Sequence, residues 1–123
     1  MESMKGKEYL TKPKHFAAVH NEGESWVSRI MVMRTLPNGL DYSRYGFSIS
    51  RRVGGAVVRN RIKRLLREIL RRISVQGGWD IVFVARQASA NIDYTSLEGV
   101  VLSLLSRAQL LAEKYERVGL KIN

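Results

Sequence analysis

The chain contains no cysteine, few histidines and no long apolar run, and each shortage removes a class of function. Without cysteine there is no thiol chemistry, no disulfide and no cysteine-based zinc site. His15 and His20 lie five residues apart, so they do not share a helix face, which argues against zinc. The apolar stretch at 99–105 is too short to span a bilayer, and lysines interrupt the first thirty residues. We therefore expect a soluble cytoplasmic protein.

Catalytic machinery is also missing. The eleven acidic residues are scattered, with no close pair on one predicted element that would hold a metal or perform acid–base catalysis. No Gly-x-Ser-x-Gly motif is present. Gly54 and Gly55 precede a predicted helix, but the Lys-Ser/Thr of a phosphate-binding loop does not follow them. The residues therefore indicate a chain that does not itself break a bond.

Positive charge is abundant and concentrated in one segment. The chain has 21 Lys and Arg against 11 Asp and Glu, a net charge of +10. Residues 44–72 hold ten Lys and Arg and a single acid, Glu68, which leaves net +9 in this stretch. Such crowding favours an anionic partner, and a phosphate backbone fits best because arginine presents a planar fork of donors. With Asn60 set between Arg59 and Arg61, we interpret the segment as a nucleic-acid-binding surface.

The length of 123 residues predicts one domain, 1–123, whose first ten residues are loosely ordered. Thr11 is the expected cap of a short helix that reaches about Asn21. Apolar patterning and turn signals predict two antiparallel strands, at 25–36 and 44–51, on either side of the Pro37-Asn38-Gly39 turn. They also predict a helix at 56–73, a buried strand at 79–85, and a helix at 94–115 that is capped by Asp93 or Asn91.

The basic helix at 56–73 is amphipathic. At about 100° per residue, its apolar stripe consists of Val58, Ile62, Leu65, Leu66, Ile69, Leu70 and Ile73. The polar arc carries Arg61 and Arg64 among other cations, whereas Arg59 lies beside the stripe and is expected to point past the sheet edge. Binding to an anionic membrane is an alternative for such a helix. The stripe lacks bulky aromatics and is needed to cover the sheet, which disfavours that alternative.

The segment 46–68, GFSISRRVGGAVVRNRIKRLLRE, resembles the signature of the bacterial ribonuclease P protein subunit. Eight or more fixed positions recur at fixed spacing across a strand, a loop and a helix. Two segments on either side resemble the same family more weakly. Residues 10–19 contain Phe16, and residues 81–86 end in Ala-Arg. The resemblance covers about residues 10–110.

The resemblance implies an α+β fold. It would be a single compact α/β sandwich-like domain, similar to a ribosomal protein, with a sheet of about four strands packed with helices. It also implies a left-handed β-α-β crossover through the basic helix. The sequence pattern alone predicts no hand, and the general rule favours a right-handed crossover.

The resemblance also implies a function as the protein subunit of ribonuclease P, a ribonucleoprotein endonuclease that removes the 5′ leader of precursor tRNA. The catalytic RNA with its bound Mg²⁺ would perform the hydrolysis, so no catalytic residue, protein metal site, small-molecule cofactor or membrane partner is expected. The implied contacts with the catalytic RNA are Arg51, Arg52, Arg59, Asn60, Arg61, Lys63, Arg64 and Arg67. The implied contacts with the leader are Phe16, His20, Val32 and Arg34.

In this pattern Phe16 supplies a stacking face, while His20 and Arg34 stand where the family often has aromatics. Both side chains still stack on bases. Three other functions remain open, namely a ribosomal protein or RNA chaperone, a DNA-binding architectural protein, and a free-standing nuclease. Recovery of leader cleavage when catalytic RNA is added would distinguish a ribonuclease P subunit from a ribosomal protein or RNA chaperone. Competition between duplex DNA and structured RNA would distinguish it from a DNA-binding architectural protein. The lack of an acid cluster disfavours the third.

Overall fold

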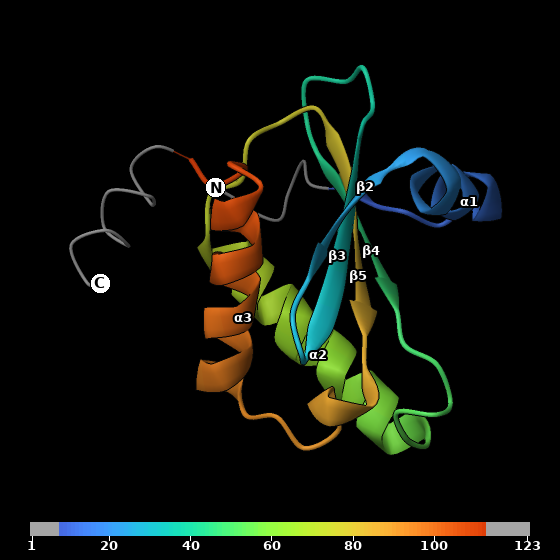
Figure 1. Cartoon of the computed structure of the whole chain (residues 1–123), viewed down its shortest axis with the longest axis vertical. Coiled ribbons are helices and arrows are strands. Elements are labelled where there is room, and N and C mark those ends of the chain that lie inside the picture. Colours follow the sequence, from blue (N-terminus) through green and yellow to red (C-terminus); the bar gives the residue numbers. More distant parts are fainter. Residues whose placement is uncertain (1–7, 113–123) are drawn as a thin grey trace.

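The computed structural model describes residues 8–112 as one mixed sheet with helices on both faces. Figure 1 shows the sheet edge-on, with α1 on one side and α2 and α3 on the other. No helix within 8–112 is long and apolar enough to cross a membrane. In chain order the elements are β1 (Glu8–Tyr9), α1 (Pro13–Glu22), β2 (Glu24–Val27), β3 (Met31–Pro37), β4 (Arg44–Ser48), α2 (Ala56–Arg72), β5 (Trp79–Ala85), the 3-10 turn η1 (Gln87–Ser89) and α3 (Tyr94–Arg107).

The five strands lie in the order β1-β4-β5-β3-β2. β4 is parallel to both β1 and β5, whereas β3 is antiparallel to β5 and to β2. α2 connects the adjacent parallel strands β4 and β5, as the predicted β-α-β crossover requires. The α+β class is confirmed, with a fifth strand of only two residues. The hand of the crossover stays a prediction.

The main core lies between the sheet and the pair α2 and α3. Met31, Met33, Tyr45, Ile81 and Phe83 project from the strands and are almost fully buried. Burying one large apolar side chain contributes about 1.5–3 kcal/mol. The predicted stripe of α2 meets this layer, where Ile62, Leu65, Leu66, Ile69, Leu70 and Ile73 are buried and Val58 is partly buried. The helix predicted at 56–73 is confirmed to within one residue.

The single strand predicted at 25–36 is wrong, because β2 and β3 are separate strands joined by a tight turn. The Ser28 hydroxyl accepts hydrogen bonds from the backbone N–H of Ile30 (3.3 Å) and Met31 (3.0 Å) and donates one to the Met31 carbonyl (2.8 Å). A serine therefore closes this turn without glycine or proline.

Three other boundaries differ from the predictions. The first helix is capped by Lys12 rather than Thr11, and the helix predicted to reach Tyr115 ends at Arg107, with Gln109 at a φ of 60°. Residues 113–115 lie outside the described part. The strand predicted at 44–51 ends at Ser48 and pairs with β1 and β5. It therefore runs antiparallel to β3 but is not its neighbour in the sheet.

The first ten residues are better ordered than predicted where the structure describes them. Glu8–Tyr9 pair with Arg44 and Tyr45, and Leu10 is buried. Residues 1–7 lie outside the described part. Asp93 is confirmed as the cap of α3, because its carboxylate accepts from the Ser96 N–H (2.8 Å), and this hydrogen bond lowers the pKa of Asp93.

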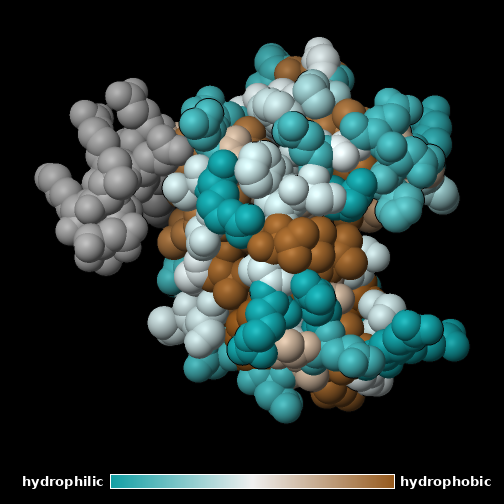
Figure 2. Space-filling model, in the orientation of Figure 1, coloured by the Kyte–Doolittle hydropathy of each residue, from teal (hydrophilic) through white to brown (hydrophobic). Residues whose placement is uncertain are grey.

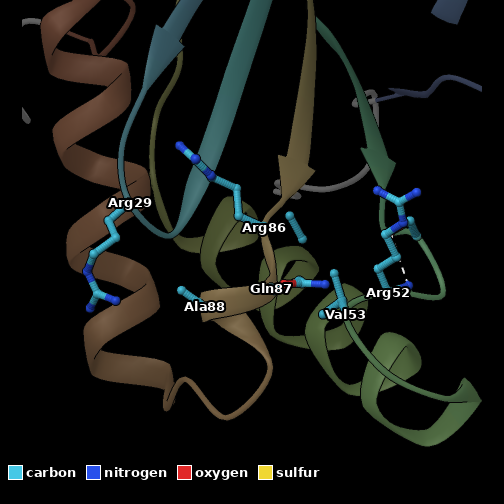
Figure 3. Close-up of a pocket in the computed structure, with 8 residues that line it drawn as sticks. Arg29, Arg52, Val53, Arg86, Gln87 and Ala88 are labelled. Atoms are coloured by element: carbon cyan, nitrogen blue, oxygen red, sulfur yellow. Dashed lines mark hydrogen bonds between the residues drawn. The ribbon is translucent and has the colours of Figure 1, made fainter.

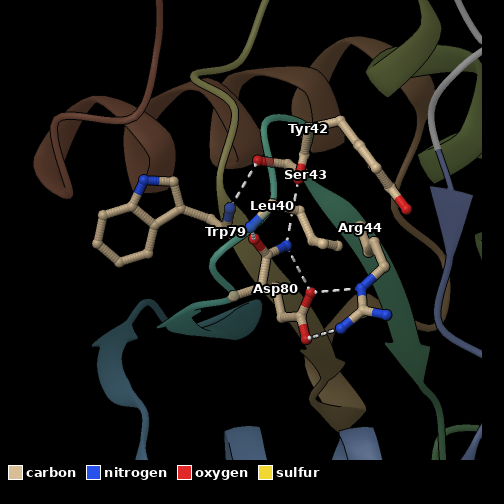
Figure 4. A network of polar contacts seen from close by, with 7 residues as sticks. Leu40, Tyr42, Ser43, Arg44, Trp79 and Asp80 are labelled. Carbon is tan, nitrogen blue, oxygen red and sulfur yellow. Dashed lines mark hydrogen bonds and ion pairs between the residues drawn. The ribbon is translucent and has the colours of Figure 1, made fainter.

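A buried ion pair ties the starts of β4 and β5 to the end of β3 (Figure 4). Arg44 donates from Nε and Nη2 to the two carboxylate oxygens of Asp80, each over 2.8 Å. The Asn38 amide donates to the same carboxylate (3.0 Å) and to the Tyr42 carbonyl (3.2 Å). Asp80 is buried, so the pair is shielded from solvent. Asp80 therefore acts as an ion-pair partner inside the fold rather than as a turn or cap residue.

Replacing Asp80 with alanine should lower the free energy of unfolding by about 3–5 kcal/mol, because the Arg44 guanidinium loses its carboxylate in a poorly solvated place. Urea unfolding measures this loss. Glu68→Ala is the control, since its carboxylate is 3.9 Å from Arg71 on an exposed helix face, and we expect a change within about 0.5 kcal/mol. Equal urea midpoints for the two variants would contradict a stabilising role for the Arg44–Asp80 pair.

Candidate nucleic-acid interface

Docking of α2 by one stripe divides its cations between two flanks. With the buried stripe facing the sheet, a step of 100° per residue places Arg61 and Arg72 on the flank toward α3. The same geometry places Asn60, Lys63, Arg64, Arg67 and Arg71 on the outer surface and the opposite flank. The contacts described next agree with this division.

On the α3 flank the cations are used within the fold. Arg61 is half-buried and donates from Nη2 to the Ile92 carbonyl in the loop before α3 (2.6 Å). The guanidinium of Arg72 lies 5.7 Å from the ring centroid of Tyr94, the first residue of α3. These two arginines therefore hold α2 to α3. The assignment of Arg61 to a freely exposed arc was wrong for this reason.

On the opposite flank Arg67 lies over the edge of the sheet. Its guanidinium carbon is 6.0 Å from the ring centroids of both Tyr9 and Phe47, which belong to β1 and β4. The two rings are 5.7 Å apart in a tilted arrangement. Burial raises the pKa of Tyr9, and the positive charge of Arg67 opposes this shift. The Arg67 guanidinium thus packs over this aromatic pair, while the Arg67 side chain remains exposed to solvent.

The loop before α2 adds further cations. Arg51 and Arg52 are exposed on a turn in which the Val53 N–H donates to the Ser50 carbonyl (3.1 Å). Arg59 is half-buried and donates from Nε to the Gly54 carbonyl (3.1 Å), so it folds back on the loop rather than pointing past the sheet edge. Among the eight residues predicted to contact the catalytic RNA, the exposed ones are Arg51, Arg52, Asn60, Arg64 and Arg67.

The second candidate surface is the face of the sheet that α1 covers only in part. α1 packs on β3 and β5, where Leu10, Val19 and Val82 form a small core with Phe16 against it. Beyond this core, one cross-strand row remains partly open to solvent. Strand register places its members side by side, in the order Val27, Val32, Val84 and Ser48.

This row forms the floor of a cleft. Val27 is 50% exposed, Val32 and Val84 are half-buried, and Ser48 is exposed. In Figure 2 the surface is hollowed on this side, between the helix α1 and the loop that joins β4 to α2. The sequence pointed to Val32 alone. The alternation along β5 would have identified Val84, but Val27 and Ser48 join the row only through the register of neighbouring strands.

Phe16 forms the inner edge of the cleft. Its half-buried ring lies so close to Gly46 that a Cβ atom at position 46 would be 2.6 Å from Phe16 Cε1 and 3.2 Å from Leu10 Cδ1. Glycine is therefore required in this part of β4 for space rather than for backbone conformation. The ring is therefore packed in part against the small core and exposed in part to the cleft.

The other two predicted leader residues lie at the C-terminal end of α1. Arg34 donates to the carbonyls of Val19 (3.5 Å) and His20 (2.6 Å) and to the Ser25 hydroxyl, so it also caps α1. His20 is exposed beside it. At the covered end of the same face, loss of hydration and the nearby Arg44 lower the pKa of His15, which favours its neutral form.

No three His, Asp or Glu side chains within residues 8–112 gather closely enough to hold a metal ion. The two surfaces therefore offer cations, one stacking ring and an apolar floor, but no group of acids for hydrolysis. Such surfaces bind a phosphate backbone and single-stranded bases.

Comparison with known proteins agrees with this chemistry. A family model described as ribonuclease P matches residues 4–109. A protein from Dehalococcoides mccartyi named ribonuclease P protein component is 44% identical over 118 residues, which are 96% of this chain and 98% of that protein.

Solved structures show the same fold. A Staphylococcus aureus RNase P protein mutant, described as having defective mRNA degradation activity, matches with a TM-score of 0.79 and 29% identity over 88% of this chain and 92% of that chain. The RNase P protein from Thermotoga maritima matches with a TM-score of 0.75 and 34% identity over 81% and 96%.

The two flanks of α2 predict different responses to loss of one charge. Arg61→Ala should lower the free energy of unfolding by about 1–3 kcal/mol, because it leaves the Ile92 carbonyl without its donor. Arg64→Ala, on the exposed surface of the same helix, should change it by no more than about 0.5 kcal/mol. Urea titration compares both with the wild type. If Arg64→Ala is the more destabilising of the two, the division of the flanks is incorrect.

Proposed function

Because this chain belongs to the bacterial ribonuclease P protein family, we propose that its two surfaces hold two different RNAs. The protein is a subunit of an endoribonuclease that matures the 5′ end of tRNA. In our proposal the exposed cations of α2 and the preceding loop bind the catalytic RNA. The half-open cleft beside α1 binds the 5′ leader of precursor tRNA, and the complex works in the cytoplasm.

The observation that carries this proposal is the placement of the exposed cations outside the cleft. Asn60, Arg64 and Arg67 follow the outer surface of α2, and Arg51 and Arg52 extend it along the loop. A folded RNA presents phosphates over a broad area, and a row of guanidinium groups on a rigid helix matches that demand. Arg59 is held on the loop before α2, and Arg61 is held on the segment before α3. In our proposal their remaining N–H groups also contact this RNA.

The cleft has the chemistry expected for an unpaired strand. The exposed Val27, the two half-buried valines and the Phe16 ring offer apolar contact and stacking, which accept any base. Base-edge donors are scarce on the floor, where Ser48 is the one polar side chain of the row. A leader of variable sequence needs a surface of this tolerant kind.

The chemical step is assigned to the RNA. The residues described here, 8–112, hold no acid cluster fit for Mg²⁺, so in our proposal the catalytic RNA binds the ions that activate water. In this proposal residues 8–112 supply no proton carrier or nucleophile to the reaction. Its contribution is to bind and position substrate and RNA.

Reconstitution tests the proposal. The purified chain is added to a bacterial ribonuclease P RNA at low Mg²⁺, and cleavage of a labelled precursor tRNA is followed. We expect the chain to restore cleavage at the mature 5′ end under conditions in which the RNA alone is inactive. Equal rates with and without the chain, across Mg²⁺ concentrations, would rule out the proposed subunit role.

The purified chain alone should cleave neither precursor tRNA nor mRNA, with or without Mg²⁺, because its described part lacks convergent catalytic groups. The mRNA substrate is included because the Staphylococcus aureus relative is described with an mRNA degradation activity. Gel analysis after micrococcal nuclease treatment of the preparation gives the result. Site-specific cleavage that survives this treatment would place a catalytic site in the protein.

Arg64→Ala should weaken binding to the catalytic RNA while leaving stability unchanged. One lost phosphate contact lowers the slope of log affinity against log salt by roughly 0.9 or less. Filter binding at several salt concentrations measures both quantities. Arg107→Ala is a matched control, since Arg107 is an exposed arginine on α3, away from the surface of α2. An affinity and slope equal to the wild type for Arg64→Ala would exclude this surface as the RNA contact.

Phe16→Ala should reduce the affinity of the reconstituted enzyme for precursor tRNA more than for mature tRNA. Losing one stacked base costs about 1–3 kcal/mol, whereas emptying a fully packed Phe site costs about 3–5 kcal/mol of stability. Phe16→Leu retains the apolar contact with Val82 but not the stacking face, so it separates the two effects. If both variants melt far below the wild type and still distinguish precursor from product normally, Phe16 is core only.

A further inference from the structure

The outer edge of the sheet at β2 carries main-chain groups that β3 does not use. β2 is the last strand of the sheet and pairs with β3 on one side. Just after β2, the Ser28 N–H donates to the Met31 carbonyl (2.9 Å), so these two residues form a hydrogen-bonded pair. Such pairs alternate along an antiparallel ladder, so the N–H and carbonyl groups of Ser25 and Val27 point away from β3. An edge of this kind is a template for a further strand.

One side chain protects part of this edge. Arg107, on α3, donates from Nη1 to the outward carbonyl of Val27 (2.9 Å). Charged side chains commonly protect edge strands in this way. Ser25 is exposed and half of the Val27 side chain is exposed, so most of the edge is open to solvent. Because Arg107 is itself exposed, its guanidinium can exchange this carbonyl for another acceptor.

Acidic residues gather at one end of this edge and basic residues at the other. Exposed Glu22 and Glu24 lie where β2 begins, whereas Arg29 and the guanidinium of Arg107 lie where it ends. Figure 3 shows Arg29 extending from the β2–β3 turn, apart from Arg86 at the end of β5. A two-fold axis through the middle of β2 reverses this order in a second copy, so that acids meet arginines. The edge is therefore complementary in charge to itself.

α3 presents small side chains beside the same edge. At 100° per residue, the flank of α3 that carries Arg107 also carries Ser96, Val100 and Ser103. The two serines are exposed, and Val100 is half-buried against the core. Since α3 lies against β2, two copies joined at β2 would bring these flanks of α3 together. Packed helix axes lie about 8–10 Å apart, depending on the side chains between them, and serine favours the short distance.

The net charge of +10 opposes self-association, but this edge is far from the most basic surface. Arg67 and its neighbours on the outer side of α2 lie over β1 and β4, at the opposite edge of the sheet. Four strand spacings separate the two edges, roughly 19 Å, whereas exposed charges are screened over about 8–10 Å at moderate salt. Pairing at β2 therefore keeps the α2 cations of two copies apart and leaves the outer surface of α2 uncovered.

We propose that β2 pairs antiparallel with β2 of a second copy of this chain, so that two sheets join into one. The Ser25 N–H donates to the Val27 carbonyl of the second copy, and the Val27 N–H donates to the Ser25 carbonyl of that copy. Arg107 leaves the Val27 carbonyl and pairs with Glu24 of the second copy. The contact is isologous, so each bond occurs twice. It is also small, so the dimer is weak and depends on concentration. This inference does not depend on the proposed function.

Sedimentation velocity of the full chain, purified free of nucleic acid, tests the pairing over a range of concentrations. The wild type should change from monomer to dimer as its concentration rises, and more readily at higher salt, because screening weakens the repulsion between the copies. Contacts with RNA weaken with salt, so a dimer bridged by RNA has the opposite trend. A chain that stays monomeric throughout, or a dimer that disappears once nucleic acid is removed, overturns the inference.

Ser25→Pro removes an outward N–H from each copy without removing a bond to β3. We expect dimer affinity to fall by at least about tenfold, because two hydrogen bonds of the interface are lost. Ser25→Ala is the matched control, since it removes the hydroxyl that accepts from Arg34 but keeps the N–H. Urea unfolding verifies that both variants fold. Equal dimer affinity of the two folded variants overturns the strand pairing.

An exchange of charge tests the same interface without altering the backbone. Glu24→Arg alone and Arg107→Glu alone should each lower dimer affinity by about tenfold. The double variant should recover it, because opposite charges face each other again. Glu68→Arg is the control, since it makes the same charge change on an exposed face of α2. A double variant that loses as much as the two single losses combined, or an equal loss in the control, overturns the proposed contact.

Discussion

Burial of the aliphatic stripe of α2 against the sheet is the interaction on which the rest of the molecule depends. A helix fixed along one stripe leaves its other sides uncovered, and nine of the ten cations of the 44–72 segment lie on α2 or on the loop before it, while the tenth, Arg44, lies on β4. One flank meets α3, where Arg61 and Arg72 become part of the fold. The other faces the edge of β1 and β4 and stays available to a partner. One apolar contact thus sorts the same residue type into structural roles and solvent-exposed positions.

The helices cover the two faces of the sheet to different extents, and the cleft results from this difference. α2 and α3 together cover one face, whereas α1, with ten residues, covers part of the other. β5 is apolar on both faces from Ile81 to Ala85, so its end beyond α1 leaves Val84 partly exposed to solvent. An apolar strand beneath a short helix thus leaves an apolar floor.

The sequence predicted those elements whose signals are local. The stripe of α2 and the apolar run of β5 are each contained in one stretch of chain, and both are confirmed. The break between β2 and β3 was missed because Ser28 closes the turn with its side chain, and the strands around it continue the β-branched pattern. β1 was missed because two residues carry no period. Arg61 and Arg64 look alike in sequence, and only the position of α3, set by distant contacts, separates them.

The close approach of Phe16 to Gly46 has a consequence for how this family of sequences changes over time. With the Phe16 ring in place, a methyl group at position 46 would lie 2.6 Å from the ring, so the ring would have to shift. A smaller side chain at position 16 meets no such obstacle. A side chain is therefore gained more easily at position 46 after the ring has been lost, and the ring is regained more easily after the glycine has returned. The two positions are coupled through this one contact.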